Sequence, residues 1–304
     1  MMEQDKLREK NLIIHNEIDM KSLNNIASLL ECIDTIDRIS DQEWKATLND
    51  RKVKELEFHD KDRDKDLVEK VKISDSYEKF YGNKKYYTAV KRSSDYVKKW
   101  IKNESVGKVF LDYACGNGAN ALFAANCGAA LSLGFDISGV SVKNAKDAAI
   151  EAGVVVNTRF FQADAENTKL PDNSIDVIVC SGMLHHLDLS YALPELRRIL
   201  KPGGKIMAVE ALDYNPAIKL YRMITPAMRT DWEKAHILDL SDVRFATRFL
   251  DLHKIRYWHV FGYIGGKFPT LFPFFDALDI LLERIPYVQR LAWIFTFELH
   301  KKLD

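Results

Sequence analysis

This chain of 304 residues has few cysteines, no excess of positive or negative charge, and no long apolar run. Its four cysteines lack the spacing of a metal site or a disulfide framework, which predicts free thiols in a reducing compartment. Lysine and arginine balance aspartate and glutamate at 44 each, so no positive excess marks a nucleic-acid backbone as partner. The few cysteines argue against a secreted domain stabilised by disulfides. The balanced charge argues against a nucleic-acid-binding protein.

The sequence also lacks a transmembrane segment, which needs about twenty mainly apolar residues. The charged residues 1–10 lead into no apolar run of signal-peptide type, and we therefore expect a cytoplasmic protein. Hydrophobic residues make up 47% of the chain, enough for one sizeable core. We expect a helical N-terminal extension over residues 1–75 and one main domain over residues 76–304.

The most informative stretch is 109–120, where a short apolar strand is followed by Asp112, a turn of small residues and a helix. Such a turn lets the backbone approach a bulky ligand, and the first amides of the helix stay available to bind it. About twenty residues after Gly116, a second strand-like run ends in Asp136, where a carboxylate can accept both ribose hydroxyls. These features predict a nucleotide-binding corner.

Strand-like and helical runs alternate along residues 109–210, which predicts a parallel sheet covered by helices on both faces. Ligands of such sheets bind beyond the carboxyl ends of the strands. The residues expected at the ends of the third and fourth strands are Asp164, Ala165, Glu166, Ser181, His185 and His186. A fifth strand follows the turn Leu200-Lys201-Pro202-Gly203-Gly204.

In this order, the motifs resemble those of the class I S-adenosylmethionine-dependent methyltransferases. That family has Asp-x-Gly-x-Gly-x-Gly, an acid ending the second strand, an Asp-Ala pair after the third, and Leu-Lys-Pro-Gly-Gly before the fifth. The resemblance covers roughly residues 76–212 and departs from the family at Ala114, where the family has its first glycine. It implies a three-layer, doubly wound α/β fold with a seven-stranded sheet whose last strand is antiparallel. To complete that sheet we expect a helix around 241–252, a strand over 257–263 and a final strand near 291–299.

The resemblance also implies S-adenosyl-L-methionine as cofactor and S-adenosyl-L-homocysteine as product. Asp112 would lie near the methionine amine, Asp136 would bind the ribose, and Asp164 with Ala165 would hold the adenine. Tyr81 is included because related methyltransferases often cover the cofactor with an aromatic segment, although its ring would equally well pack on the core. The residues expected to bind the cofactor are Asp112, Ala114, Gly116, Gly118, Asp136, Ile137, Asp164, Ala165, Glu166, Ser181 and Tyr81.

Methyl transfer from a sulfonium is an in-line displacement, and alignment alone supplies ~7–11 kcal/mol in favourable cases. A base is required only where the acceptor has a proton to lose, and the catalytic candidates are His185, His186 and Tyr214. A histidine at this place would alternatively only pin the loop. Arg222 and Arg229 are candidates for binding an anionic acceptor, with structural roles equally open. No residue, His59 included, is assigned to a metal.

The acceptor class is narrowed by another absence, because the fourth strand does not end in the Asn-Pro-Pro-Tyr motif of amino and nucleic-acid methyltransferases. A small-molecule acceptor remains, and aromatic insertions near 213–240 and 265–290 favour a lipophilic or natural-product one. We expect the first insertion to lie above the active face. The second insertion is interpreted as a lid, a homodimer surface, an interfacial contact or a segment that simply packs at the sheet edge.

Two other functions stay open. A non-catalytic cofactor-binding module would use the N-terminal helices as a partner surface. A nicotinamide-dependent oxidoreductase is the other, because Gly116-x-Gly118-x-x-Ala121 satisfies the looser dinucleotide fingerprint. In the extension, Ser40-x-x-Glu43 predicts a capping box at a helix start, and the mixed-charge run 59–66 is interpreted as a solvated helix face or linker.

Overall fold

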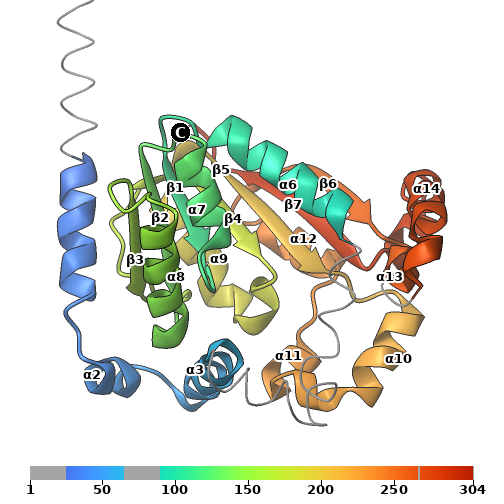
Figure 1. The fold of residues 1–304 in the computed structure, drawn as a ribbon, viewed down its shortest axis with the longest axis horizontal. Helices are drawn as coiled ribbons and strands as arrows, with labels where there is room; N and C mark the ends of the chain where they lie inside the picture. The colour runs from blue at the N-terminus through green and yellow to red at the C-terminus, as the bar shows by residue number, and fades with distance from the viewer. Residues whose placement is uncertain (1–24, 65–89, 266–267, 304) are drawn as a thin grey trace, which may run out of the picture.

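A computed structural model describes residues 25–64, 90–265 and 268–303 of the chain. At its centre is a seven-stranded sheet of order β3-β2-β1-β4-β5-β7-β6 (Figure 1). β7 runs antiparallel to both of its neighbours, and the other pairs in the order β3-β2-β1-β4-β5 are parallel. The predicted fold class is thereby confirmed. The strands are β1 (Val109–Tyr113), β2 (Leu131–Asp136), β3 (Thr158–Gln162), β4 (Ile175–Ser181), β5 (Leu200–Ala211), β6 (Asp251–Trp258) and β7 (Ile294–His300).

Helices cover the sheet on both faces, which explains why every residue of β1 and β2 is buried. On one face lie α6 (Lys91–Glu104), α7 (Ala119–Asn126) and α8 (Gly139–Glu151) (Figure 1). Their packing buries Ile101 and Phe110 completely. On the other face, α9 (Leu189–Ile199) and α12 (Leu240–Ala246) contribute to the largest apolar cluster. This packing fixes the positions of the strand ends relative to one another.

The N-terminal helices pack against the sheet. A helix through residues 25–36 lies beside β3, and α2 (Asp41–Ala46) and α3 (Asp50–Arg63) continue across the lower edge of the sheet in Figure 1. The predicted capping box is present at α2: the Ser40 hydroxyl accepts the Glu43 N–H at 3.4 Å, and the Glu43 carboxylate accepts the Ser40 N–H at 3.1 Å. The buried indole of Trp44 donates to the Ile137 carbonyl at 3.4 Å, which attaches α2 beyond the end of β2.

Three predicted boundaries in the second half are wrong. The helix expected over 241–252 ends at Ala246, and the strand expected from Tyr257 already begins at Asp251. β6 is an edge strand whose first residues are exposed, so it carries charged side chains that do not resemble a buried strand. Likewise β5 begins inside the Leu-Lys-Pro-Gly-Gly segment, where its pairing with β4 shifts register.

The two insertions occupy different places. The first contains α10 (Pro216–Ile224), a 3-10 turn η3 (Pro226–Met228) and α11 (Asp231–Ala235), which lie on the same side of the sheet as α3 (Figure 1). The second contains α13 (Gly262–Gly265), η4 (Pro269–Leu271), α14 (Phe272–Leu282) and η5 (Val288–Leu291), at the opposite end of the molecule from β3.

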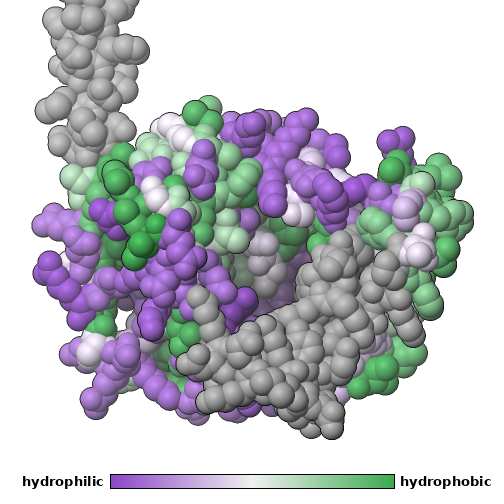
Figure 2. Space-filling view, in the orientation of Figure 1, coloured by the Kyte–Doolittle hydropathy of each residue, from purple (hydrophilic) through white to green (hydrophobic). Residues whose placement is uncertain are grey.

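α14 is tied to α6 by Arg92, which pairs with Asp276 and with Glu283 at 2.6 Å each. Figure 2 shows apolar side chains gathered over α14, where Phe274 is 65% and Leu281 60% exposed. Across the described parts of the chain, no helix is long and apolar enough to cross a membrane. Whether this insertion is a lid, a dimer surface or an interfacial contact stays a prediction.

Gly118, at the start of α7, occupies a position that other residues fit poorly. Its φ is +79°, and a Cβ there would lie 2.7 Å from Phe160 Cε1 and 2.9 Å from Ala145 Cβ. We expect Gly118→Ala to lower the free energy of unfolding by about 1–3 kcal/mol, measured by urea denaturation. Gly107→Ala is the control, because Gly107 also has a positive φ of +67° but nothing within 4 Å. Equal losses in both variants would contradict the steric explanation.

Candidate functional site

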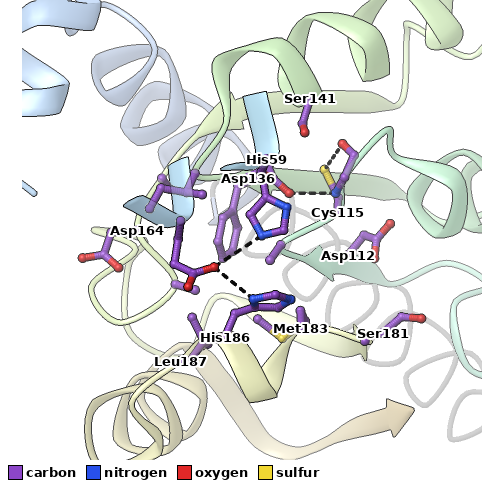
Figure 3. Close-up of a pocket in the computed structure, with 18 of the residues that line it drawn as sticks. His59, Asp112, Cys115, Asp136, Ser141, Asp164, Ser181, Met183, His186 and Leu187 are labelled. Atoms are coloured by element: carbon purple, nitrogen blue, oxygen red, sulfur yellow. Dashed lines mark hydrogen bonds and ion pairs between the residues drawn. The ribbon is translucent and has the colours of Figure 1, made fainter. Parts of the chain in front are cut away.

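A cavity of about 420 Å³ opens at the carboxyl ends of β1, β2 and β3 (Figure 3). Parallel strands carry their ends to one edge of the sheet, so residues distant in sequence meet there. Around this space the structure places a large part of the predicted set. The predicted residues that line it are Asp112, Ala114, Gly116, Asp136, Ile137, Asp164, Ala165, Glu166, Ser181 and His186.

Asp136 binds the small-residue turn to the end of β2. Its carboxylate accepts the N–H of Gly116 at 2.8 Å and the N–H of Ser138 at 3.0 Å, and the residue is only 7% exposed. Burial raises the pKa of Asp136, and these two backbone hydrogen bonds oppose that shift. Ala114, which replaces the family's first glycine, adopts a φ of +52°. The turn therefore keeps a left-handed residue at this position without a glycine.

Asp112 lies at the base of the cavity, where its carboxylate caps α7. It accepts the N–H groups of Asn120 and Ala121 at 3.2 and 3.3 Å, as well as the Asn120 side-chain amide at 3.2 Å. Burial raises the pKa of Asp112 to about 7 despite these hydrogen bonds. A cation placed beside this carboxylate would stabilise its ionised form and lower that pKa.

This raised pKa predicts a pH dependence of cofactor affinity. Below about pH 7 free Asp112 binds a proton, and this proton would have to leave before the carboxylate could pair with the methionine amine that the family resemblance places beside it. We expect the Kd for S-adenosylmethionine to rise by up to about tenfold per pH unit below that value. Calorimetry between about pH 5.5 and pH 8 measures it. Asp112→Asn should flatten the profile, and a flat profile in the unmodified protein would contradict the prediction.

Helix α3 forms a wall of the cavity that the sequence analysis missed. Its lining residues recur along one helical face and are Arg51, Lys52, Glu55, His59 and Arg63. Lys52 pairs with Asp164 at 2.6 Å and with Glu166 at 2.9 Å, and Arg51 also pairs with Glu166. The interpretation of run 59–66 as a solvated face or linker is wrong for His59 and Arg63, because both line the cavity.

Glu55, His59 and His186 meet where α3 approaches the 3-10 turn η2 (Leu184–His186). His186 Nδ1 lies 3.0 Å and His59 Nε2 lies 3.7 Å from the same Glu55 oxygen (Figure 3). The two imidazole rings pack edge to face with their centroids 4.9 Å apart. Burial, together with His186 and Arg63 nearby, holds the pKa of His59 well below its usual 6.5.

A second cavity of about 620 Å³ shares His59, Ser181 and His186 with the first. On its wall, His185 Nδ1 lies 2.7 Å from Glu210 at the end of β5. Glu210 is 1% exposed, and its other oxygen accepts the N–H groups of Met183 and Leu184 at 2.9 and 2.8 Å. When the Glu210 carboxylate accepts the Nδ1–H of His185, the ring takes the tautomer in which Nε2 is the proton acceptor.

Four predicted residues lie elsewhere, and a fifth, Tyr81, falls outside the described residues. Gly118 packs on Phe160 behind the turn, and the Tyr214 hydroxyl accepts the Leu240 N–H at 3.2 Å. Arg222 pairs with Asp213 at 2.9 Å and Arg229 with Glu233 at 3.4 Å. Tyr214, Arg222 and Arg229 are not among the residues that line these two cavities.

A sheet of this order, with a small-residue turn and acidic strand ends around one cavity, defines a nucleoside-binding α/β fold. Residues 111–208 match the family described as "Methyltransferase domain". The chain therefore contains a methyltransferase domain, and its sheet has the seven-stranded order of the class I S-adenosylmethionine-dependent methyltransferases, whose cofactor is S-adenosyl-L-methionine. The resemblance inferred from the motifs is confirmed.

Relatives of established name match about a third of the chain. The 27-O-demethylrifamycin SV methyltransferase of Amycolatopsis mediterranei is 36% identical over 33% of this chain and 37% of its own length. The ubiquinone/menaquinone biosynthesis C-methyltransferase UbiE of Idiomarina loihiensis is 36% identical over 34% of this chain and 43% of its own length. The matches therefore span less than half of these relatives.

Among solved structures, the geranyl diphosphate C-methyltransferase of Streptomyces coelicolor, with S-adenosyl-L-homocysteine bound, has a TM-score of 0.53. It is 14% identical and covers 75% of this chain and 85% of its own. At this identity the likeness shows the shared fold. The comparisons give no support to the nicotinamide-dependent oxidoreductase or to the non-catalytic module.

Proposed function

We propose that the protein is an enzyme that transfers a methyl group from S-adenosylmethionine to a small, lipophilic acceptor by in-line displacement. The observation that carries the proposal is the convergence of Asp112, Gly116, Asp136 and Asp164 on one cavity inside the matched methyltransferase domain. S-adenosyl-L-homocysteine is then the product. Natural-product and quinone methyltransferases among the matched relatives support a small-molecule acceptor.

The carboxylates of the cavity suit the three parts of the cofactor. Asp136 uses lone pairs for two backbone N–H groups, and a carboxylate has about four lone-pair sites, so it can also accept two ribose hydroxyls. Asp112 would face the amine and Asp164 the adenine. Lys52 from α3 neutralises Asp164 and Glu166 and would close this end of the cavity.

The second cavity is the proposed acceptor site, because it shares a wall with the first. Apolar residues of its lining favour a lipophilic molecule; they are Val97, Val209, Met228, Trp293 and Ile294. The His185–Glu210 dyad supports an acceptor that loses a proton, such as a hydroxyl group or an acidic C–H. The proton would move to His185 Nε2 as the methyl group bonds to the acceptor.

Calorimetry with the full chain tests the proposal most directly. We expect S-adenosylmethionine and S-adenosyl-L-homocysteine to bind at about one site per chain, and methyl transfer to occur with members of a panel of lipophilic phenols and hydroxyquinones. Binding without turnover over the panel would favour the non-catalytic module. A change in fluorescence of reduced nicotinamide cofactor, with neither nucleoside bound, would favour the oxidoreductase.

Two finer proposals concern location and assembly. The four cysteines are all free, which supports the reducing environment of the cytoplasm. The exposed apolar side chains of α14 support a homodimer through that helix or an interfacial contact. Light scattering of the purified chain, beside a Phe274→Ser variant, distinguishes a dimer through α14 from a monomer.

A further inference from the structure

Three side chains between the two cavities combine into a donor set that the methyl-transfer proposal does not use. Glu55 and His59 lie one turn apart on α3, and His186 lies on η2. One ligand atom from each of the three falls within 4.8 Å of the others. Two imidazole nitrogens and a carboxylate oxygen are the donors that ions such as Zn²⁺ and Co²⁺ bind.

The distances within this cluster are those of a site with space for an ion. Two ligands at ~2.05 Å from a tetrahedral ion are roughly 3.3 Å apart. The distances from the Glu55 oxygen are 3.0 Å to His186 and 3.7 Å to His59, on either side of that value. A hydrogen-bonded Glu55–His186 pair explains the shorter distance. That hydrogen bond does not explain why His59 Nε2 also points at this oxygen, at a distance too long for a hydrogen bond.

The buried negative charge of Glu55 also favours a bound cation. Glu55 is 4% exposed, and a buried carboxylate needs a cation, a metal or several hydrogen bonds. Asp164 and Glu166 have Lys52, and Asp136 has two backbone N–H groups. Within the described ranges, by contrast, the ion pairs of Glu55 are with His59 and His186 alone.

We propose that Glu55, His59 and His186 bind one divalent transition-metal ion of the Zn²⁺ or Co²⁺ type. Three protein ligands leave coordination positions open, as in catalytic zinc sites. His59 and His186 line both cavities, so these positions face the space between cofactor and acceptor. An acceptor oxygen would bind there, and its proton would then pass more readily to His185 Nε2. This role rests on the proposed methyl transfer, whereas metal binding itself does not.

The test is a titration of the metal-free full chain with Co²⁺, followed by its visible absorption and by displacement with Zn²⁺. We expect about one ion per chain with a spectrum of imidazole-bound Co²⁺. Glu55→Gln and His59→Ala should each weaken binding by more than the roughly 100-fold that loss of an outer hydrogen-bond partner of a metal site can cost. His59→Gln keeps the side-chain volume if the alanine variant fails to fold, which circular dichroism would show.

The group of His253, Glu298 and His300 at the sheet edge, in which His253 is exposed and Glu298 is buried, provides the matched control. His253→Ala should leave the Co²⁺ spectrum and affinity unchanged. The proposal is overturned if the chain binds no Co²⁺, if Glu55→Gln and His59→Ala bind it as the unmodified chain does, or if His253→Ala removes the spectrum. Because the titration contains neither S-adenosylmethionine nor an acceptor, a failure here leaves the proposed methyl transfer standing.

Discussion

Asp136→Ala is expected to weaken the binding of S-adenosylmethionine by roughly 10²- to 10⁴-fold. The substitution removes the proposed acceptor of both ribose hydroxyls, and a hydrogen bond to a charged group contributes roughly 1.5–3 kcal/mol. It also releases the N–H groups of Gly116 and Ser138, which the carboxylate holds at 2.8 and 3.0 Å. Calorimetric Kd values of variant and unmodified chain give the result.

Two further variants distinguish loss of the ribose contact from a general loss of folding or binding. Asp136→Asn keeps the size of the side chain and one acceptor oxygen, so its loss of affinity should be intermediate. Asp251→Asn changes an exposed acid on the edge strand β6 and should leave the Kd unchanged. Thermal unfolding shows whether Asp136→Ala is still folded. A folded Asp136→Ala variant that binds the cofactor normally would refute the assigned role of this carboxylate.

His185→Ala is expected to lower kcat for a proton-losing acceptor by roughly 10²- to 10⁴-fold, the usual contribution of a general base. The cofactor Kd should stay nearly unchanged, because His185 lines the second cavity and not the first. Glu210→Gln should also lower kcat, since its amide can donate to Nδ1 and so favour the wrong tautomer of His185. Transfer of labelled methyl groups from S-adenosylmethionine measures both.

His253→Ala, an exposed histidine of β6, is the matched control and should retain full turnover. Binding experiments with the same variants separate chemistry from cofactor affinity. If His185→Ala turns over as fast as the unmodified chain, His185 is no base and only positions the loop of η2. That result would favour an acceptor with a lone pair and no proton to lose.

The positions of Asp112, Gly116 and Asp136 were predictable from the sequence because their signals are local. A short apolar run, a turn of small residues and an acid at the next strand end follow one another within 28 residues of chain, from Val109 to Asp136. The helices and parallel strands between them repeat simple periodicities. The antiparallel β7 was predictable only through the family resemblance, because its place between β5 and β6 is a long-range choice.

The wall formed by α3 was not predictable in this way. A helix face that carries Arg51, Lys52 and His59 looks the same in sequence whether it meets water or a cavity. Its partners Asp164 and Glu166 follow more than a hundred residues later, at the end of β3. Edge strand β6 poses the related difficulty, because exposed charges on it hide the pattern of a strand.

By itself, the sequence determined the resemblance to the methyltransferase domain, the order of strands and helices through the central domain, and the carboxylates expected to bind the cofactor. Only the tertiary structure decided that α3 closes over these carboxylates, that Glu210 holds His185, and that Glu55, His59 and His186 converge. The reason is physical. Hydrophobic period and turn chemistry act between near neighbours, whereas the pairing of buried charges depends on which distant segments the folded core brings together.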